Sequence, residues 1–249
     1  MRIAPNIYLV ASGVQGCSLT NDLDCNCWLF DAEDVYLLFD TGAGVDVPSI
    51  LREMQDDGLN PEKLAYAFLT HGHADHSGGA FEIKRLLGCT LLCSELTAGL
   101  LLKGEEGISL AAARSAGVYP HHYRYRQPIP DVAFERGASF DLGNATVTSL
   151  PTPGHSLDHT SFVIEQNGFR ALVTGDALLH SGRMIYQKTY DFDVGRSCDS
   201  ILSLSQVAFD ALLPGHGLFA RTGGHRHVDA AAALIDQMRT PLAVDFTQI

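Results

Sequence analysis

The sequence predicts a layered α/β fold with mixed sheets rather than a single parallel sheet. Short apolar segments with the length of strands come in runs, and helical segments fall between only some of them. The chain has 249 residues, of which 46% are hydrophobic, so it suits one large domain or two small ones and can bury most of its apolar surface without disulfide bonds. We expect one domain over residues 1–249.

The expected strands are short, rich in aliphatic or β-branched residues, and bounded by Gly, Asp, Asn or Pro, which favour turns. They are Ile7–Ala11, Cys27–Phe30, Tyr36–Phe39, Tyr66–Leu69, Thr90–Cys93, Ala145–Leu150, Ser161–Ile164 and Ala171–Val173. Cys25 and Cys27 could form a metal-binding pair, but Cys27 is better explained as a small buried residue that enters its strand.

The expected helices begin or end at residues that favour helix ends. Asp46 is a candidate N-cap of the first helix, Pro48 lies in its first turn and Gly58 follows it. The expected helices are Val47–Asp57, Ser77–Leu87, Ser94–Lys103, Ile108–Ala116, Cys198–Ser205 and Val228–Met238. The stretch Tyr119–Pro130 is rich in Pro, His and Tyr, and we expect a loop there that could cover a substrate.

Composition and charge argue against several classes of partner. The formal net charge is −12 and Lys and Arg are scattered, whereas nucleic-acid binding needs clustered positive charge. No segment approaches the about 18 apolar residues of a membrane span, and the N-terminus lacks the apolar core of a signal peptide. We expect a cytoplasmic protein that acts on a small molecule, with no nucleic-acid or membrane partner. A homodimer is expected only from the general frequency of symmetric dimers.

The strongest chemical signal is the segment THGHADHSGG at residues 70–79. It follows an apolar strand and places His71, His73, Asp75 and His76 within six residues. Three imidazoles and a carboxylate are costly to bury without a purpose, and both groups are ligands of borderline divalent metals. A solvated histidine-rich turn is the alternative, but similar residues follow later strands, so we interpret the segment as half of a metal site.

Three further residues follow apolar segments farther along the chain. They are His155 in the segment TPGHS, Asp176 in VTGDA and His216 in LLPGHG, and each has Gly directly before it. Glycine lets the backbone approach a site closely. Any one of these residues alone could be an ordinary loop residue, but together they predict the remaining ligands.

These segments together resemble the metallo-β-lactamase superfamily. THGHADHSGG resembles the family signature H-x-H-x-D-H, and LLFDTG at residues 37–42, PGHS, TGDA and LPGHG resemble its other motifs in the same order. The resemblance covers most of the chain. It implies a four-layer αββα sandwich, in which two mixed sheets pack face to face with helices outside and the site lies at one edge.

The resemblance also implies a ligand set for two divalent ions. The implied ligands are His71, His73 and His155 for the first ion, Asp75, His76 and His216 for the second, and Asp176 as a bridge between both. Asp40 is implied to have a supporting role. His159 is implied to orient a ligand, although an ordinary buried polar role is equally compatible with the sequence.

The implied activity is that of a metal-dependent hydrolase. Two ions roughly 3.5–4 Å apart can share a hydroxide, and metal binding lowers the pKa of water to near 7. We expect this bridging hydroxide to attack a carbonyl carbon, with Asp75 as the catalytic residue that orients it. Zinc is the expected metal, with iron, manganese and cobalt as alternatives. The sequence contains no G-x-S-x-G motif, which agrees with the absence of a serine nucleophile.

The expected substrate is a small ester, thioester or lactone. The bridging Asp176 makes the chain similar to the glyoxalase II-like and lactonase-like members rather than to true β-lactamases. Leu179 stands where the homoserine-lactone lactonases have Tyr. Two alternatives stay open, a two-metal phosphodiesterase and a non-catalytic metal-binding regulatory module. The sequence does not assign the residues that bind the substrate.

Overall fold

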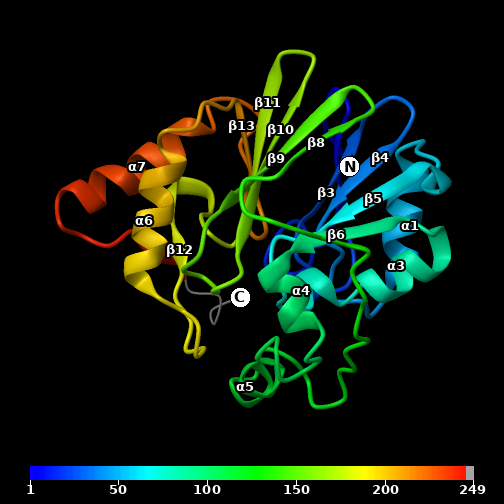
Figure 1. Cartoon of the computed structure of the whole chain (residues 1–249), viewed down its shortest axis with the longest axis horizontal. Helices are drawn as coiled ribbons and strands as arrows, with labels where there is room; N and C mark the ends of the chain where they lie inside the picture. Colours follow the sequence, from blue (N-terminus) through cyan, green and yellow to red (C-terminus); the bar gives the residue numbers. More distant parts are fainter. Residues whose placement is uncertain (245–249) are drawn as a thin grey trace. The chain divides into compact units, whose positions relative to one another are not determined.

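The computed structural model of the chain describes residues 1–244, which fall into two compact units (Figure 1). The first unit is Met1–Glu135 and the second begins at Arg136. Each unit contains its own sheet and its own helices, so both are of mixed α/β type. That the whole chain acts as one domain stays a prediction.

A seven-stranded sheet forms the centre of the first unit. Its strands, in spatial order, are β1 (Arg2–Ala4), β2 (Ile7–Ala11), β3 (Cys27–Asp31), β4 (Tyr36–Phe39), β5 (Leu64–Phe68), β6 (Thr90–Ser94) and β7 (Val132–Phe134). The strands β1 to β4 pair antiparallel, and β4 to β7 pair parallel. The carboxyl ends of β4 and β5 therefore lie at the same edge of the sheet.

Helices cover one face of this sheet. The helices of the first unit are α1 (Val47–Asp56), α2 (Ala74–Ser77), α3 (Ala80–Leu87), α4 (Glu95–Leu101), α5 (Leu110–Ser115) and the 3₁₀ helix η1 (Pro61–Lys63). Ile50 of α1, Ile83 of α3 and Leu101 of α4 join Leu29 and Leu38 in one buried core. The opposite face carries large aromatic side chains, among which Phe39 stacks on Phe68 with 5.1 Å between ring centroids. Both faces are buried, which explains why β3 and β4 are almost continuously apolar.

The second unit is built on a five-stranded sheet. Its strands, in spatial order, are β13 (Ala211–Pro214), β11 (Phe169–Gly175), β10 (Thr160–Gln166), β9 (Ala145–Pro151) and β8 (Ser139–Leu142), and a separate pair is formed by β12 (Met184–Ile185) and β14 (Ala243–Val244). Its helices are α6 (Val194–Leu204), α7 (His225–Asp236) and the 3₁₀ helix η2 (His180–Gly182). Ile201 of α6 and Val228 of α7 pack with Leu172 and Leu212 of the sheet in a second core.

All eight expected strands are present, although several are longer than expected. The expected helix Ser77–Leu87 is wrong at its start, because the structure has two helices, α2 and α3, separated at Gly78 and Gly79. A Cβ at Gly79 would lie 2.0 Å from the carbonyl oxygen of Thr41, so the backbone there passes too close to the segment after β4 for any other residue.

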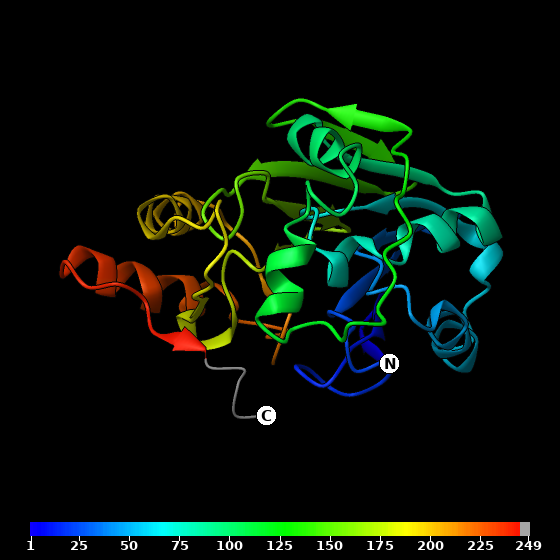
Figure 2. The same cartoon turned by 90° about the horizontal axis from the view of Figure 1, so that it is seen from below.

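The stretch Tyr119–Pro130 contains no helix or strand, as predicted (Figure 2). It nevertheless has buried side chains, including Tyr119 and Tyr123. Within residues 1–244, every helix is too short or too polar to cross a lipid bilayer.

Candidate metal centre

The four expected ligands of the first unit lie in one cluster at the carboxyl edge of its sheet. They follow β5 and run into α2. The ring of His71 lies 4.5 Å from that of His73 and 4.2 Å from that of His76, measured between centroids. Oδ2 of Asp75 lies 3.6 Å from Nε2 of His76. The cluster therefore brings three imidazoles and one carboxylate together, with His71 and His76 fully buried.

Asp40 fixes the orientation of this cluster from the end of the neighbouring strand β4. Its carboxylate accepts hydrogen bonds from the backbone N–H of Thr70 (2.8 Å), from the hydroxyl of Thr70 (2.8 Å) and from Nδ1 of His76 (2.8 Å). The Thr70 hydroxyl, which donates to Asp40, lies 2.9 Å from Nδ1 of His71 and can accept from it. This network assigns the proton of both rings to Nδ1, so Nε2 carries the lone pair that a metal would use.

Asp40 has a left-handed backbone, with φ of +60°. Asp tolerates this conformation better than most residues, which helps to explain why a carboxylate can be placed at this strand end. Its contacts hold Thr70 and His76 in place, and the supporting role at a metal centre stays a prediction.

Cys25 lies beside the same cluster. Ligand atoms of Cys25, Asp40 and His76 lie within 4.8 Å of one another, and the Cys25 and Cys27 sulfurs are 3.8 Å apart. Burial raises the pKa of the Cys25 thiol well above its usual value, so the sulfur stays protonated at neutral pH. Sequence reasoning missed the proximity of Cys25 to His76, because the two residues lie about 50 positions apart in the chain.

The three expected ligands of the second unit also converge. His155, Asp176 and His216 follow the ends of β9, β11 and β13, which run in the same direction. Oδ2 of Asp176 lies 3.3 Å from Nε2 of His155 and 3.5 Å from Nε2 of His216. All three side chains are buried. A single carboxylate oxygen thus lies close to both imidazole nitrogens.

Local contacts hold the second cluster in place. His159 accepts a hydrogen bond at Nε2 from the backbone N–H of Asp176 (3.1 Å), and its Nδ1 lies 2.9 Å from the hydroxyl of Thr152. His159 therefore holds the backbone of Asp176, and its role at a metal centre stays a prediction. Gly154, with φ of +142°, precedes His155, and a Cβ there would lie 2.3–2.5 Å from atoms of Ser197 in α6. Glycine is required at this close approach.

The donor spacing in both clusters fits a bound cation. Distances of 3.3, 3.5 and 3.6 Å between imidazole nitrogen and carboxylate oxygen exceed those of strong hydrogen bonds. Two ligand atoms that share a tetrahedral zinc at about 2.0–2.2 Å lie roughly 3.4 Å from each other. Imidazole and carboxylate are also the donor types that suit zinc, iron and manganese. The residues present therefore fit divalent metal ions.

Tyr119 contacts the first cluster from the loop after α5. Its hydroxyl donates to Oδ1 of Asp75 (2.7 Å) and accepts from the backbone N–H of Asp75 (3.0 Å). Burial and the neighbouring Asp75 carboxylate raise the pKa of Tyr119 well above its usual value, so the hydroxyl keeps its proton and donates. Sequence reasoning missed this residue, because no local pattern distinguishes it from the other tyrosines of the loop.

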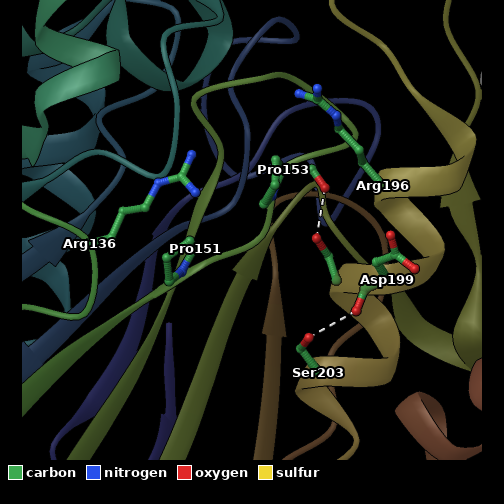
Figure 3. A pocket seen from close by; sticks show the side chains of 7 residues that line it. Arg136, Pro151, Pro153, Arg196, Asp199 and Ser203 are labelled. Atoms are coloured by element: carbon green, nitrogen blue, oxygen red, sulfur yellow. Dashed lines mark hydrogen bonds between the residues drawn. The ribbon is translucent and has the colours of Figure 1, made fainter.

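A hollow of about 410 Å³ lies in the second unit on the α6 side of the segment that leads to His155 (Figure 3). It is lined by Arg136, Pro151, Pro153, Arg196, Asp199, Ser200 and Ser203. The hydroxyl of Ser200 donates to the carbonyl of Pro153 (2.7 Å), which ties α6 to this segment. The lining includes none of the expected metal ligands.

Comparison with known proteins gives relatives of the chain. A sequence model of the metallo-β-lactamase superfamily matches residues 20–216. The lactamase-like protein vrtG of Penicillium aethiopicum is 28% identical over 219 residues, which is 87% of this chain and 58% of that protein. The atrochrysone carboxyl ACP thioesterase of Passalora fulva is 28% identical over 194 residues, which is 73% of this chain and 44% of the thioesterase. The chain spans about half the length of the curated relatives it matches.

Solved structures share the fold. The native FEZ-1 metallo-β-lactamase from Legionella gormanii matches with a TM-score of 0.70 and 18% identity, over 94% of this chain and 92% of the other. This likeness confirms the predicted fold class. The segment matched by the superfamily model also contains all seven expected ligands, from His71 to His216. The chain belongs to the metallo-β-lactamase superfamily.

Proposed function

We propose that the protein is a hydrolase that uses two divalent metal ions, held jointly by the two clusters. The observation that carries the proposal is the position of Asp176, whose Oδ2 lies 3.3 Å from one imidazole nitrogen and 3.5 Å from another. A carboxylate between two histidines is suited to bridge two ions. The proposed ligands are His71, His73 and His155 for the first ion, Asp75, His76 and His216 for the second, and Asp176 for both.

Divalent ions held there would lower the pKa of water to near 7 and polarise a carbonyl oxygen of the substrate. The residues of the chain position and orient the reactants. Asp75 orients the attacking water through its carboxylate. The contacts with Asp40 and Thr70 favour the proton of the His76 and His71 rings at Nδ1, so that Nε2 would be the atom that binds a metal. His159 keeps the backbone of Asp176 in place.

The proposed substrate is a thioester, ester or lactone, and the thioester has the most support. That support comes from the relative in Passalora fulva, which is described as an atrochrysone carboxyl ACP thioesterase. A thiol has a pKa of about 8.5, far below that of an alcohol, so a thiolate leaves readily without first being protonated. We propose zinc as the metal, with iron and manganese as the other candidates.

Removal of the metal is expected to abolish activity. Treatment with a chelator should lower turnover of an acyl thioester or lactone by about 100-fold or more, and added zinc, iron or manganese should restore it. The assay uses a glutathione thioester, a lactone, a p-nitrophenyl phosphodiester and a β-lactam, each with the native, chelated and reloaded protein. The metal that restores the highest turnover identifies the preferred ion.

Each outcome of this assay has a distinct meaning. Turnover of the thioester, lactone or both that depends on metal supports the proposed hydrolase and selects its substrate class. Turnover of the phosphodiester alone would replace it with a two-metal phosphodiesterase. Bound metal without turnover of any of the four compounds would contradict catalysis and favour a metal-binding regulatory module.

A further inference from the structure

Three tyrosines of one loop have hydroxyl groups that form hydrogen bonds around the turn Ala74–Ser77, which carries the proposed ligands Asp75 and His76. We name the segment from Tyr119 to Tyr125 the tyrosine loop. Tyr119 bonds Asp75, Tyr123 donates to the carbonyl of Ala43 (2.7 Å), and the hydroxyl of Tyr125 lies 3.0 Å from that of Ser77. The loop has no helix or strand of its own. These hydrogen bonds connect it to other segments of the first unit.

Only one of the three hydroxyls touches a proposed metal ligand. The Tyr119 hydroxyl binds both the carboxylate oxygen Oδ1 and the backbone N–H of Asp75. The other carboxylate oxygen, Oδ2, lies 3.6 Å from Nε2 of His76, which is the spacing of two ligands on one cation. The hydrogen bond of Tyr119 therefore determines which oxygen of Asp75 is directed toward the proposed ion.

The position of Tyr119 is itself fixed. Its side chain is buried, and its ring stacks on the ring of Tyr123 with centroids 5.0 Å apart and planes 24° apart. The hydroxyl of Tyr123 is anchored to the backbone after β4. A hydroxyl held on a rigid ring imposes a narrower range of carboxylate orientations than water would, because water is free to move.

We propose that Tyr119 is a positioning residue of the metal centre. It holds Oδ1 of Asp75 so that Oδ2 is presented to the second ion, and it thereby sets the affinity for that ion and the orientation of the attacking water. This inference rests on the proposed function, because it takes Asp75 to be a ligand. Loss of such an outer hydrogen bond to a ligand lowers metal affinity or activity by about 10–100-fold.

Tyr119→Phe and Tyr125→Phe form a matched pair for the test. Each removes one hydroxyl from the same loop, and each hydroxyl bonds the same turn, but only Tyr119 touches a proposed ligand. Zinc affinity is measured by competition with a chromophoric chelator, and the visible spectrum of the cobalt-substituted protein reports the ligand geometry. Both measurements are independent of any substrate.

We expect Tyr119→Phe to weaken binding of the more weakly held ion by about 10–100-fold and to shift the cobalt spectrum. It should lower kcat with little change in KM. Tyr125→Phe should leave zinc affinity and the cobalt spectrum as in the wild type, although it also loses a hydrogen bond. In an Asp75→Asn background, adding Tyr119→Phe should change zinc affinity much less than in the wild type, because the effect acts through Asp75.

Unchanged zinc affinity and cobalt spectrum in Tyr119→Phe would overturn the inference, as would an equal loss in Tyr125→Phe. Absence of a metal centre would look different, because the wild type itself would then bind no zinc; that result would overturn the inference as well. A wild type that binds zinc without hydrolysing any substrate would still give a decisive answer on Tyr119.

Discussion

Replacing Asp176 with alanine is expected to remove metal from both proposed positions and to lower kcat/KM by more than about 100-fold. A loss of this size is a minimum estimate, because replacing residues that only orient metal ligands already lowers metal affinity or activity by about 10–100-fold. Oδ2 of Asp176 lies 3.3 Å from Nε2 of His155 and 3.5 Å from Nε2 of His216. Its loss therefore affects both ions, whereas loss of any single histidine directly affects only one. Elemental analysis and steady-state kinetics measure the two effects.

Two further variants control for indirect effects of the Asp176 change. Asp176→Asn preserves the size of the side chain but removes the charge, so it should also lose metal if the carboxylate is the bridge. Asp199→Ala removes an exposed carboxylate of the same unit, in the lining of the hollow, and should leave metal content unchanged. Wild-type metal content and turnover in Asp176→Ala would contradict the bridging role.

Replacing Asp40 with alanine is expected to destabilise the metal-free protein by about 3 kcal/mol or more, because each buried donor left without its acceptor costs about 1–3 kcal/mol. The carboxylate accepts three hydrogen bonds, two from Thr70 and one from His76, and all three groups are buried. Alanine would leave these donors without their acceptor and would also have to adopt the left-handed backbone at φ of +60°. Urea unfolding of the metal-free proteins gives the change in the free energy of unfolding.

Asp40→Ala should also lower zinc affinity by about 10–100-fold, because His76 loses the hydrogen-bond partner of its Nδ1. Asp40→Asn is the appropriate control. Asparagine tolerates the left-handed backbone and keeps one carbonyl acceptor, so it should lose less stability than alanine. A free energy of unfolding for Asp40→Ala within about 0.5 kcal/mol of the wild type would show that the network contributes little.

Most of the fold could be predicted because the central strands are buried on both faces. The strands β2 to β6 are therefore apolar along nearly their whole length, and such runs are recognisable in sequence. The missed strands give weaker signals. Both β7 and β8 are short and largely exposed. The strand β13 overlaps the segment LLPGHG, which was interpreted only as the motif that contains His216. The helix boundary at Gly78 and Gly79 was missed because it depends on close approaches to the distant Ala43 and Thr41.

The candidate ligands could be predicted because each follows the end of a strand, and parallel strands bring their ends to one edge. Cys25 and Tyr119 could not be predicted in the same way. Each contacts a residue more than 40 positions away, through loops whose path is determined by packing rather than by a local pattern. The motifs thus indicate the candidate ligands and candidate supporting residues such as Asp40, whereas Tyr119, which belongs to no motif, becomes visible only in the structure.

Metal content per chain is the direct test of the proposal that His71 and His155 bind the same metal ion. After reconstitution, the wild type should contain about two ions. His71→Ala in the first unit and His155→Ala in the second should each lower the content to about one, and the double variant should also retain about one, because both residues are proposed to bind the first ion. Fewer than about one ion in the wild type, or unchanged metal content in either single variant, would contradict the proposed two-ion site.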